Sequence, residues 1–228
     1  MTTTIEFPSN GATGTGSLAV PSGGAGPGVL VIQEWWGLVP HIEDVCERFA
    51  AEGFTALAPD FYHGRKTVEP DEAGKLLMSL QLDRAAKDFS GAIDALLQRS
   101  RGEGVGVVGF CMGGGLALVL AAERPEKVRA VVPFYGGIAW PGVVPDWSRL
   151  QAPVLAHFAE HDDFATPEYA RKLVADLRAA GNDSVTVYDY PGTQHAFFND
   201  TRPEVYDAGA SRQAWERVIP FFHRHLDS

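Results

Sequence analysis

The sequence is poor in cysteine and in positive charge, and it contains no long hydrophobic run. Two cysteines without a Cys/His cluster indicate neither a disulfide framework nor a structural metal site. A formal net charge of −10 disfavours a nucleic-acid partner, because phosphate binding requires clustered lysine and arginine. The first residues lack the basic start of a secretory signal, and the apolar runs are too short to cross a bilayer. We therefore expect a cytoplasmic protein with no membrane partner.

Length and composition favour one globular unit. The chain has 228 residues, of which 45% are hydrophobic, so a sizeable core is available. No internal repeat or low-complexity tract divides it. A Gly/Pro/Ser-rich patch at 21–28 lies too close to the start to separate two cores, and we interpret it as a hairpin turn into the first central strand. We expect a single domain over residues 1–228.

Apolar, β-branched runs alternate with helical patterns along the chain. The predicted strands are 28–33, 55–59, 105–110, 128–135, 153–158 and 184–189. The predicted helices are 42–52, 72–80, 85–99, 114–122, 167–180 and 203–225, and region 61–81 resembles a long active-site insertion. Strands that alternate with helices predict an α/β fold with a mostly parallel sheet covered on both faces. The nearly continuous apolar character of most strands agrees with burial on both sides.

A cluster of glycines surrounds one of the two cysteines, in the stretch GVGVVGFCMGGG at 104–115. Gly104, Gly106 and Gly109 match the G-x-G-x-x-G spacing of a dinucleotide-binding loop. That loop follows its strand and opens the helix, whereas here two glycines lie within or before the apolar run. The next strand also lacks the acidic residue that such a site requires. The dinucleotide interpretation is therefore the weaker one.

The same stretch fits a nucleophile turn better. Gly109, Cys111 and Gly113 form the G-x-nucleophile-x-G pattern, in which the nucleophile occupies a sharp turn between strand and helix and its neighbours must be small. Such a turn places the side chain at the carboxyl end of the sheet, and the following helix N-terminus favours the thiolate. A cysteine after a strand can also be a small buried hydrophobe. The flanking glycines favour the nucleophile.

A base and an orienting acid follow in the order that this turn requires. In α/β-hydrolase-type folds the order is nucleophile, acid, histidine. Asp162 and Asp163 follow one predicted strand and His195 follows the next, so all lie on loops at the same rim as Cys111. We expect Asp162 to orient His195, and Asp163 to be solvated or to cap the next helix. His161 is the main competitor of His195, but it precedes its aspartate.

Acyl transfer also needs two backbone N–H groups that face the developing oxyanion. The amide of Met112, immediately after the nucleophile, is one candidate. The amide of Trp35, in the loop after the first central strand, is the other. Glu34 precedes Trp35 and is unexpected there, because a carboxylate near a thiol opposes its ionisation. A loop-stabilising charge is the alternative role of this glutamate.

The sequence resembles the dienelactone hydrolase family of the α/β-hydrolase fold over nearly its whole length. The matching segments are VIQEWWG at 31–37, ALAPDFYHGR at 56–65, VGFCMGG at 108–114, AEHDDFATP at 159–167 and GTQHAFFND at 192–200. The resemblance implies an α/β-hydrolase fold, no cofactor or metal, and a triad of Cys111, His195 and Asp162. It also implies that Glu34 holds the resting thiol and takes its proton when substrate binds.

The chain departs from this family in its substrate-binding arginines. The family pattern has one arginine after the Asp-x-Tyr segment and another four residues after the histidine, and both grip a substrate carboxylate. The first position is Gly64, with Arg65 next to it, and the second is Asn199, with Arg202 three residues later. We expect Arg65 and Asn199 to contact the substrate. We also expect either Arg65 or Arg202 to take the place of the family arginines that are missing here. Aromatic pocket walls are expected at Trp35, Trp36, Phe197 and Phe198, although such residues often only pack.

These patterns predict a hydrolase of small esters or lactones that forms an acyl-enzyme on Cys111. A thioesterase or general carboxylesterase that uses the same three residues is the second interpretation. The third is a catalytically idle α/β-hydrolase that acts as a binding module. The expected partner is a small-molecule substrate, and the sequence leaves open whether the protein is a monomer or a dimer.

Overall fold

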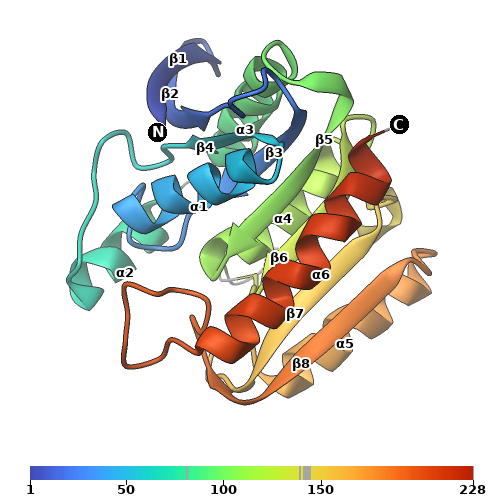
Figure 1. Cartoon of the computed structure of the whole chain (residues 1–228). Coiled ribbons are helices and arrows are strands. Elements are labelled where there is room, and N and C mark those ends of the chain that lie inside the picture. Colours follow the sequence, from blue (N-terminus) through green and yellow to red (C-terminus); the bar gives the residue numbers. More distant parts are fainter. Residues whose placement is uncertain (81, 139, 141–144, 228) are drawn as a thin grey trace.

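A computed structural model describes residues 1–80, 82–138, 140 and 145–227 of the chain (Figure 1). The described residues form one eight-stranded sheet with the order β1-β2-β4-β3-β5-β6-β7-β8. Strands β3 to β8 run parallel to one another, whereas β2 pairs antiparallel with both β1 and β4. The strands span Thr3–Ser9 (β1), Ala12–Ala19 (β2), Pro27–Ile32 (β3), Thr55–Pro59 (β4), Arg101–Phe110 (β5), Val128–Phe134 (β6), Val154–His161 (β7) and Val185–Gln194 (β8).

Helices cover both faces of the sheet. Side chains that alternate along each strand enter two separate cores, as the period of two in a strand requires. In β3, Val29 and Val31 face the core under α1 and α6, whereas Leu30 and Ile32 face the core under α3, α4 and α5. None of the described helices is long and apolar enough to span a membrane. The helices span Pro40–Ala51 (α1), Pro70–Ser79 (α2), Leu82–Leu97 (α3), Met112–Glu123 (α4), Pro167–Ala179 (α5) and Ala208–Leu226 (α6), with a 3₁₀ turn at Trp147–Arg149 (η1).

The predicted mostly parallel sheet with helices on both faces is confirmed, but the predictions for segment 21–28 and for the start of the last helix are wrong. The segment 21–28 is not a hairpin turn, because β4 lies between β2 and β3. This segment packs so closely against the backbone at Gly53 that a Cβ on Gly26 would lie 1.7 Å from the Gly53 carbonyl oxygen. The last helix begins at Ala208 rather than at 203, where Asp207 caps it by accepting a hydrogen bond from the Ala210 amide at 2.8 Å.

Candidate active site

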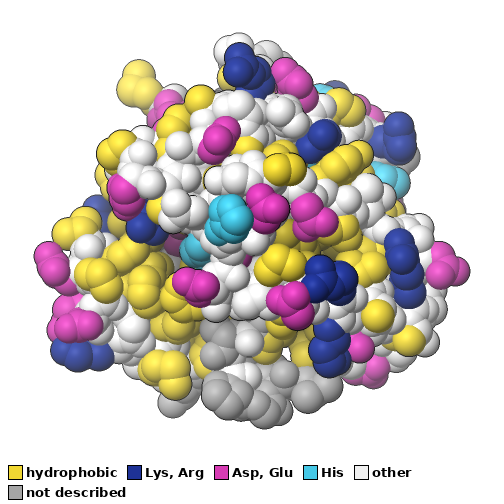
Figure 2. All heavy atoms as spheres, turned by 90° about the horizontal axis from the view of Figure 1, so that it is seen from below, with side chains coloured by type: hydrophobic (Ala, Val, Ile, Leu, Met, Phe, Trp, Pro, Cys, Tyr) yellow, Lys and Arg dark blue, Asp and Glu magenta, His cyan; other side chains and the backbone are white. Residues whose placement is uncertain are grey.

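The carboxyl ends of the central parallel strands place chemically useful side chains on one edge of the sheet. Strands β7 and β8 end in register, because His161 pairs with Gln194. The next residue on each strand is Asp162 and His195, so these two side chains emerge next to each other. The Nδ1 atom of His195 lies 2.7 Å from Oδ2 of Asp162. This edge lies at the lower end of the sheet in Figure 1, and Figure 2 looks onto it, where hydrophobic, acidic and histidine side chains lie close together.

Asp162 is held in the geometry of an orienting carboxylate. Its side chain is fully buried, and its second oxygen accepts the amides of Phe164 at 2.8 Å and Ala165 at 2.9 Å. Burial raises the pKa of Asp162, but the hydrogen bond from His195 and those two amides outweigh this effect and lower it. The ionised carboxylate only accepts hydrogen bonds, so Nδ1 of His195 carries the proton and Nε2 faces away.

Asp163 and His161, the neighbouring alternatives to Asp162 and His195, are both exposed. Asp163 is exposed at the cavity edge, and it does not cap α5, because Thr166 accepts the hydrogen bond from the Tyr169 amide. His161 is 64% exposed and lies 3.6 Å from Glu160. Of the two histidines considered, His195 is therefore the one that contacts Asp162.

Cys111 lies at a strained turn between β5 and α4. Its backbone has φ 56° and ψ −121°, a conformation that non-glycine residues rarely adopt. The two flanking glycines are required by contact, since a Cβ on Gly109 would lie 1.9 Å from the Gly113 carbonyl oxygen. Helix α4 begins at Met112, so the amides of its N-terminus lie directly after the cysteine.

The remaining glycines of the cluster serve packing. Gly104 and Gly106 lie inside β5, where a Cβ would meet the Arg129 side chain at 2.4 Å and the Phe222 ring at 2.6 Å. They do not open a helix. This arrangement contradicts the dinucleotide-loop alternative and leaves the nucleophile turn as the interpretation that the local structure supports.

Tyr135 is a residue of this edge that the sequence pattern does not reveal. It follows β6 directly next to Cys111, because Phe110 pairs with Phe134. Its ring centroid lies 5.0 Å from that of His195, and its buried hydroxyl has no hydrogen-bond partner among the described residues. The backbone of Tyr135 has φ 36°. Burial, together with the negative charge of Glu34, raises the pKa of this phenol well above its ordinary value, so it stays protonated.

The same turn at Tyr135 brings the chain onto the first turn of α4. A Cβ on Gly136 would lie 2.6 Å from the Gly114 Cα, and one on Gly115 would lie 2.1 Å from the Gly137 carbonyl oxygen. Only glycine permits such an approach of two backbones. This packing fixes the start of α4 behind Cys111.

The surroundings of His195 favour its protonated form when Cys111 is ionised. Burial lowers the pKa of this imidazole, but the negative charge of an ionised Cys111 sulfur and the hydrogen bond to Asp162 then raise it to about 10. The Nε2 atom is buried and makes no hydrogen bond of good geometry with a described residue. A group brought into the cavity next to the sulfur can therefore receive the proton of this nitrogen.

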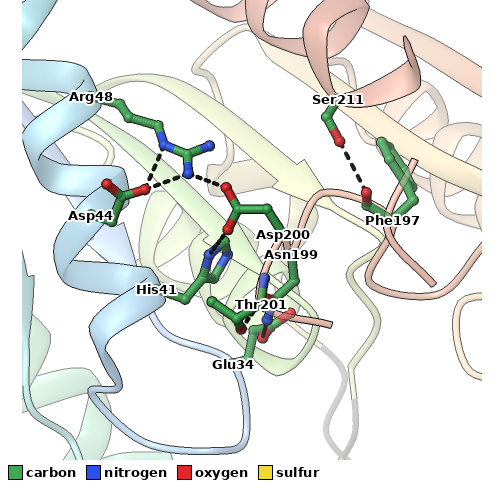
Figure 3. Close-up of polar contacts among 9 residues, drawn as sticks. All are labelled: Glu34, His41, Asp44, Arg48, Phe197, Asn199, Asp200, Thr201 and Ser211. Atoms are coloured by element: carbon green, nitrogen blue, oxygen red, sulfur yellow. Dashed lines mark hydrogen bonds and ion pairs between the residues drawn. The ribbon is translucent and has the colours of Figure 1, made fainter. Parts of the chain in front are cut away.

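Glu34 lines the same cavity as Cys111 and is buried, with 1% of its surface exposed. Its Oε2 accepts a hydrogen bond of 2.7 Å from Nδ2 of Asn199, as Figure 3 shows. Its Oε1 is buried and has no partner among the described residues. The carboxylate is therefore held at one oxygen by a neutral amide, and the other oxygen is available to accept a proton.

A cavity of about 370 Å³ connects these groups, and Glu34, Cys111 and His195 line it. Trp35 and Met112, the two predicted oxyanion donors, line it as well. No three His, Cys, Asp or Glu side chains in the described ranges are grouped to hold a metal ion. The apolar and aromatic walls are formed by Trp35, Trp36, Leu77, Ile138, Phe164, Tyr169 and Val205.

The predicted substrate-binding residues divide into two groups. Trp36 lines the cavity, and the Arg202 guanidinium lies 5.7 Å from its ring centroid and lines the cavity as well. Arg65, Asn199 and Phe197 are not among the described residues that line it. Phe197 is fully buried and packs on aromatic rings of the core, whereas the Arg65 carbonyl oxygen lies against Gly37, where an added Cβ would lie 2.6 Å from it.

Comparison with known proteins agrees with this arrangement. The sequence profile of the dienelactone hydrolase family matches residues 15–226. The chain belongs to the dienelactone hydrolase family. It is 38% identical to the protein usf of Aquifex pyrophilus over 231 residues, which covers 97% of this chain and 98% of the relative. It is 36% identical to an Aquifex aeolicus protein provisionally named a carboxymethylenebutenolidase, with the same two coverages.

A solved structure agrees with this family assignment. The crystal structure of a protein from Klebsiella pneumoniae, provisionally named a dienelactone hydrolase, superposes with a TM-score of 0.88 at 26% identity. The match covers 98% of this chain and 99% of that one. The chain therefore has the α/β-hydrolase fold, and this family member is a hydrolase, as its sequence predicted.

Proposed function

We propose that the protein hydrolyses small carboxylic esters or lactones through an acyl-enzyme on Cys111, within a single domain. The observation that carries the proposal is the 2.7 Å contact between His195 and Asp162 on the rim of the cavity that Cys111 also lines. A strained nucleophile, a base and an orienting carboxylate on one cavity are the groups that acyl transfer requires.

The first half of the reaction forms the acyl-enzyme. As substrate enters, the unpartnered Oε1 of Glu34 accepts the proton of the Cys111 thiol. The sulfur then attacks the carbonyl carbon, and the amides of Trp35 and Met112 stabilise the oxyanion. When the ester C–O bond breaks, the imidazolium of His195 gives its Nε2 proton to the leaving oxygen, while Asp162 holds Nδ1. The hydrogen bond from Nδ1 to the Asp162 carboxylate stabilises the imidazolium until it gives up this proton.

The second half releases the acid. Neutral His195 takes a proton from a water molecule, whose oxygen attacks the thioester carbon. The C–S bond breaks, the carboxylic acid leaves, and the sulfur recovers its proton from protonated Glu34. One water is consumed per ester, and every group returns to its starting charge. With a lactone, the acid and the alcohol remain in one product.

The walls of the cavity indicate the substrate class. Its aromatic and apolar lining suits an unsaturated or aryl acyl group. We propose that Arg202, rather than Arg65, contacts a carboxylate on the substrate, because Arg202 lines the cavity and Arg65 does not. Asn199 acts through Glu34 in this proposal, and Phe197 acts through core packing instead of substrate contact.

A substrate panel tests the proposal. Wild type, Cys111→Ala and Cys111→Ser are assayed on a carboxylated dienelactone, its uncharged analogue, aryl esters and thioesters. We expect ester or lactone turnover that Cys111→Ala abolishes. Preference for thioesters would favour the thioesterase alternative. Ligand binding without turnover, insensitive to Cys111→Ala, would instead support the binding module and overturn the proposal.

A further inference from the structure

A cluster of polar side chains outside the cavity links helix α1 to the loop that follows His195. Figure 3 shows this cluster, in which Asp200 lies between two residues of α1. Its Oδ1 lies 3.3 Å from Nδ1 of His41, and its Oδ2 forms an ion pair with Arg48. Arg48 is in turn paired with Asp44 of the same helix, through an Nε–Oδ2 hydrogen bond of 2.6 Å.

The residue directly before Asp200 is the one that holds Glu34. Asn199 donates its Nδ2 to Glu34 at 2.7 Å. Its Oδ1 accepts from the amide of Thr201 at 3.1 Å and from the Thr201 hydroxyl at 2.6 Å, so its amide plane is fixed on both sides. The position of Glu34 relative to Cys111 therefore depends on where the loop places Asn199.

The base of this loop is fixed independently. The carbonyl of Phe197 accepts the hydroxyl of Ser211, at the start of α6, at 2.9 Å, and the amide of Asp207 at 3.0 Å. Figure 3 shows the Ser211 contact at a distance from the Asp200 cluster. Without Asp200, the base of the loop would stay on α6, and its tip would lose the polar contacts that Asp200 makes with α1.

We propose that Asp200 is a positioning residue, which sets the Glu34 carboxylate for proton transfer from Cys111 by fixing Asn199 to α1 through His41 and Arg48. This inference depends on the proposed role of Glu34 in the hydrolase. His41 is nearly fully buried, so its partner is fixed in place, whereas Asp200 and Arg48 are about one-third exposed. An ion pair of that exposure contributes little to stability. A small change in position at a reacting group, in contrast, can lower turnover by about a hundredfold.

Asp44 provides a matched control. Asp44→Ala and Asp200→Ala each remove one carboxylate partner of Arg48, but only Asp200 belongs to the loop. For Asp200→Ala we expect kcat to fall by about tenfold to a hundredfold with little change in KM, because binding contacts in the cavity remain. For Asp44→Ala we expect kcat within about twofold of wild type, as for an exposed ion pair. Asp200→Asn keeps one acceptor oxygen and should give an intermediate kcat.

A second measurement does not depend on turnover. The pH profile of iodoacetamide alkylation reports on Cys111, because Cys46 is fully buried. Asp200→Ala should change this profile and Asp44→Ala should leave it as in wild type. Equal profiles and equal kcat values for the two variants would overturn the inference. So would a kcat loss in Asp200→Ala and Asp200→Asn that equals their unfolded fraction by circular dichroism. If wild type hydrolyses no ester, the proposed function fails, while the alkylation comparison still decides the role of Asp200.

Discussion

Replacing Cys111 by alanine should lower the pKa of His195, which stands at about 10 opposite an ionised Cys111. Two effects then remain: burial, which lowers the pKa, and Asp162, which raises it. Opposite charges about 4 Å apart attract by about 4 kcal/mol at an effective dielectric constant of about 20, which corresponds to about three pKa units. We therefore expect the Cys111→Ala imidazole to titrate about three units lower than in wild type.

Nuclear magnetic resonance of the ¹⁵N-labelled imidazole nitrogens measures this directly, with His195→Gln to assign the signal among seven histidines. While Cys111 is ionised, the imidazolium signal of wild type should persist at neutral pH and disappear as pH rises through about 10. Because the proposed leaving-group proton comes from this imidazolium, kcat/KM should fall over the same alkaline range. A wild-type His195 that titrates near its ordinary value, unchanged in Cys111→Ala, would refute the argument.

Three further outcomes follow from the packing and the cavity. Gly114→Ala should lower the free energy of unfolding by about 1–3 kcal/mol, because its Cβ would lie 2.7 Å from the neighbouring backbone. Gly74→Ala, in open space on α2, should raise it by about 0.5–1 kcal/mol. Denaturant titration compares the two variants, and equal effects would contradict the contact argument. Tyr135→Phe should leave that free energy unchanged or raise it by up to about 1 kcal/mol, because an unpartnered hydroxyl is removed, and a clear loss in thermal denaturation would reveal a partner. Arg202→Gln should raise KM for a carboxylated ester but not for its uncharged analogue, and the same selective rise in Arg65→Gln instead would assign the anion contact to Arg65.

The rim of the sheet could be predicted from the sequence, because it depends on local patterns and on one topological rule. Apolar runs locate parallel strands, and the carboxyl ends of parallel strands share an edge. The glycines around Cys111 indicate the turn by themselves. Strand β8, however, continues past the predicted end at 189 to Gln194. The Pro191–Gly192 pair is typical of a turn, yet this segment stays on β7 through a shift in register.

Other features depend on contacts that no local pattern records. Strand β2 contains Gly14 and Gly16, which weaken its strand pattern; a Cβ at either position would lie 2.7 Å from an atom of a neighbouring strand. Tyr135 takes its position from the packing of the following glycines on α4. Phe197 is predicted from its aromatic character to form a pocket wall, but the preceding Ala196 has φ 67° and the Phe197 ring enters the core.

Mass spectrometry of a reaction stopped before turnover is complete tests directly whether an acyl-enzyme forms. With a slowly deacylating aryl ester, we expect the protein to gain the mass of one acyl group. Peptide mapping should place that group on the Cys111 sulfur, and Cys111→Ala should gain none. Rapid hydrolysis by Cys111→Ala, or an acyl group carried by a different residue, would contradict this expectation.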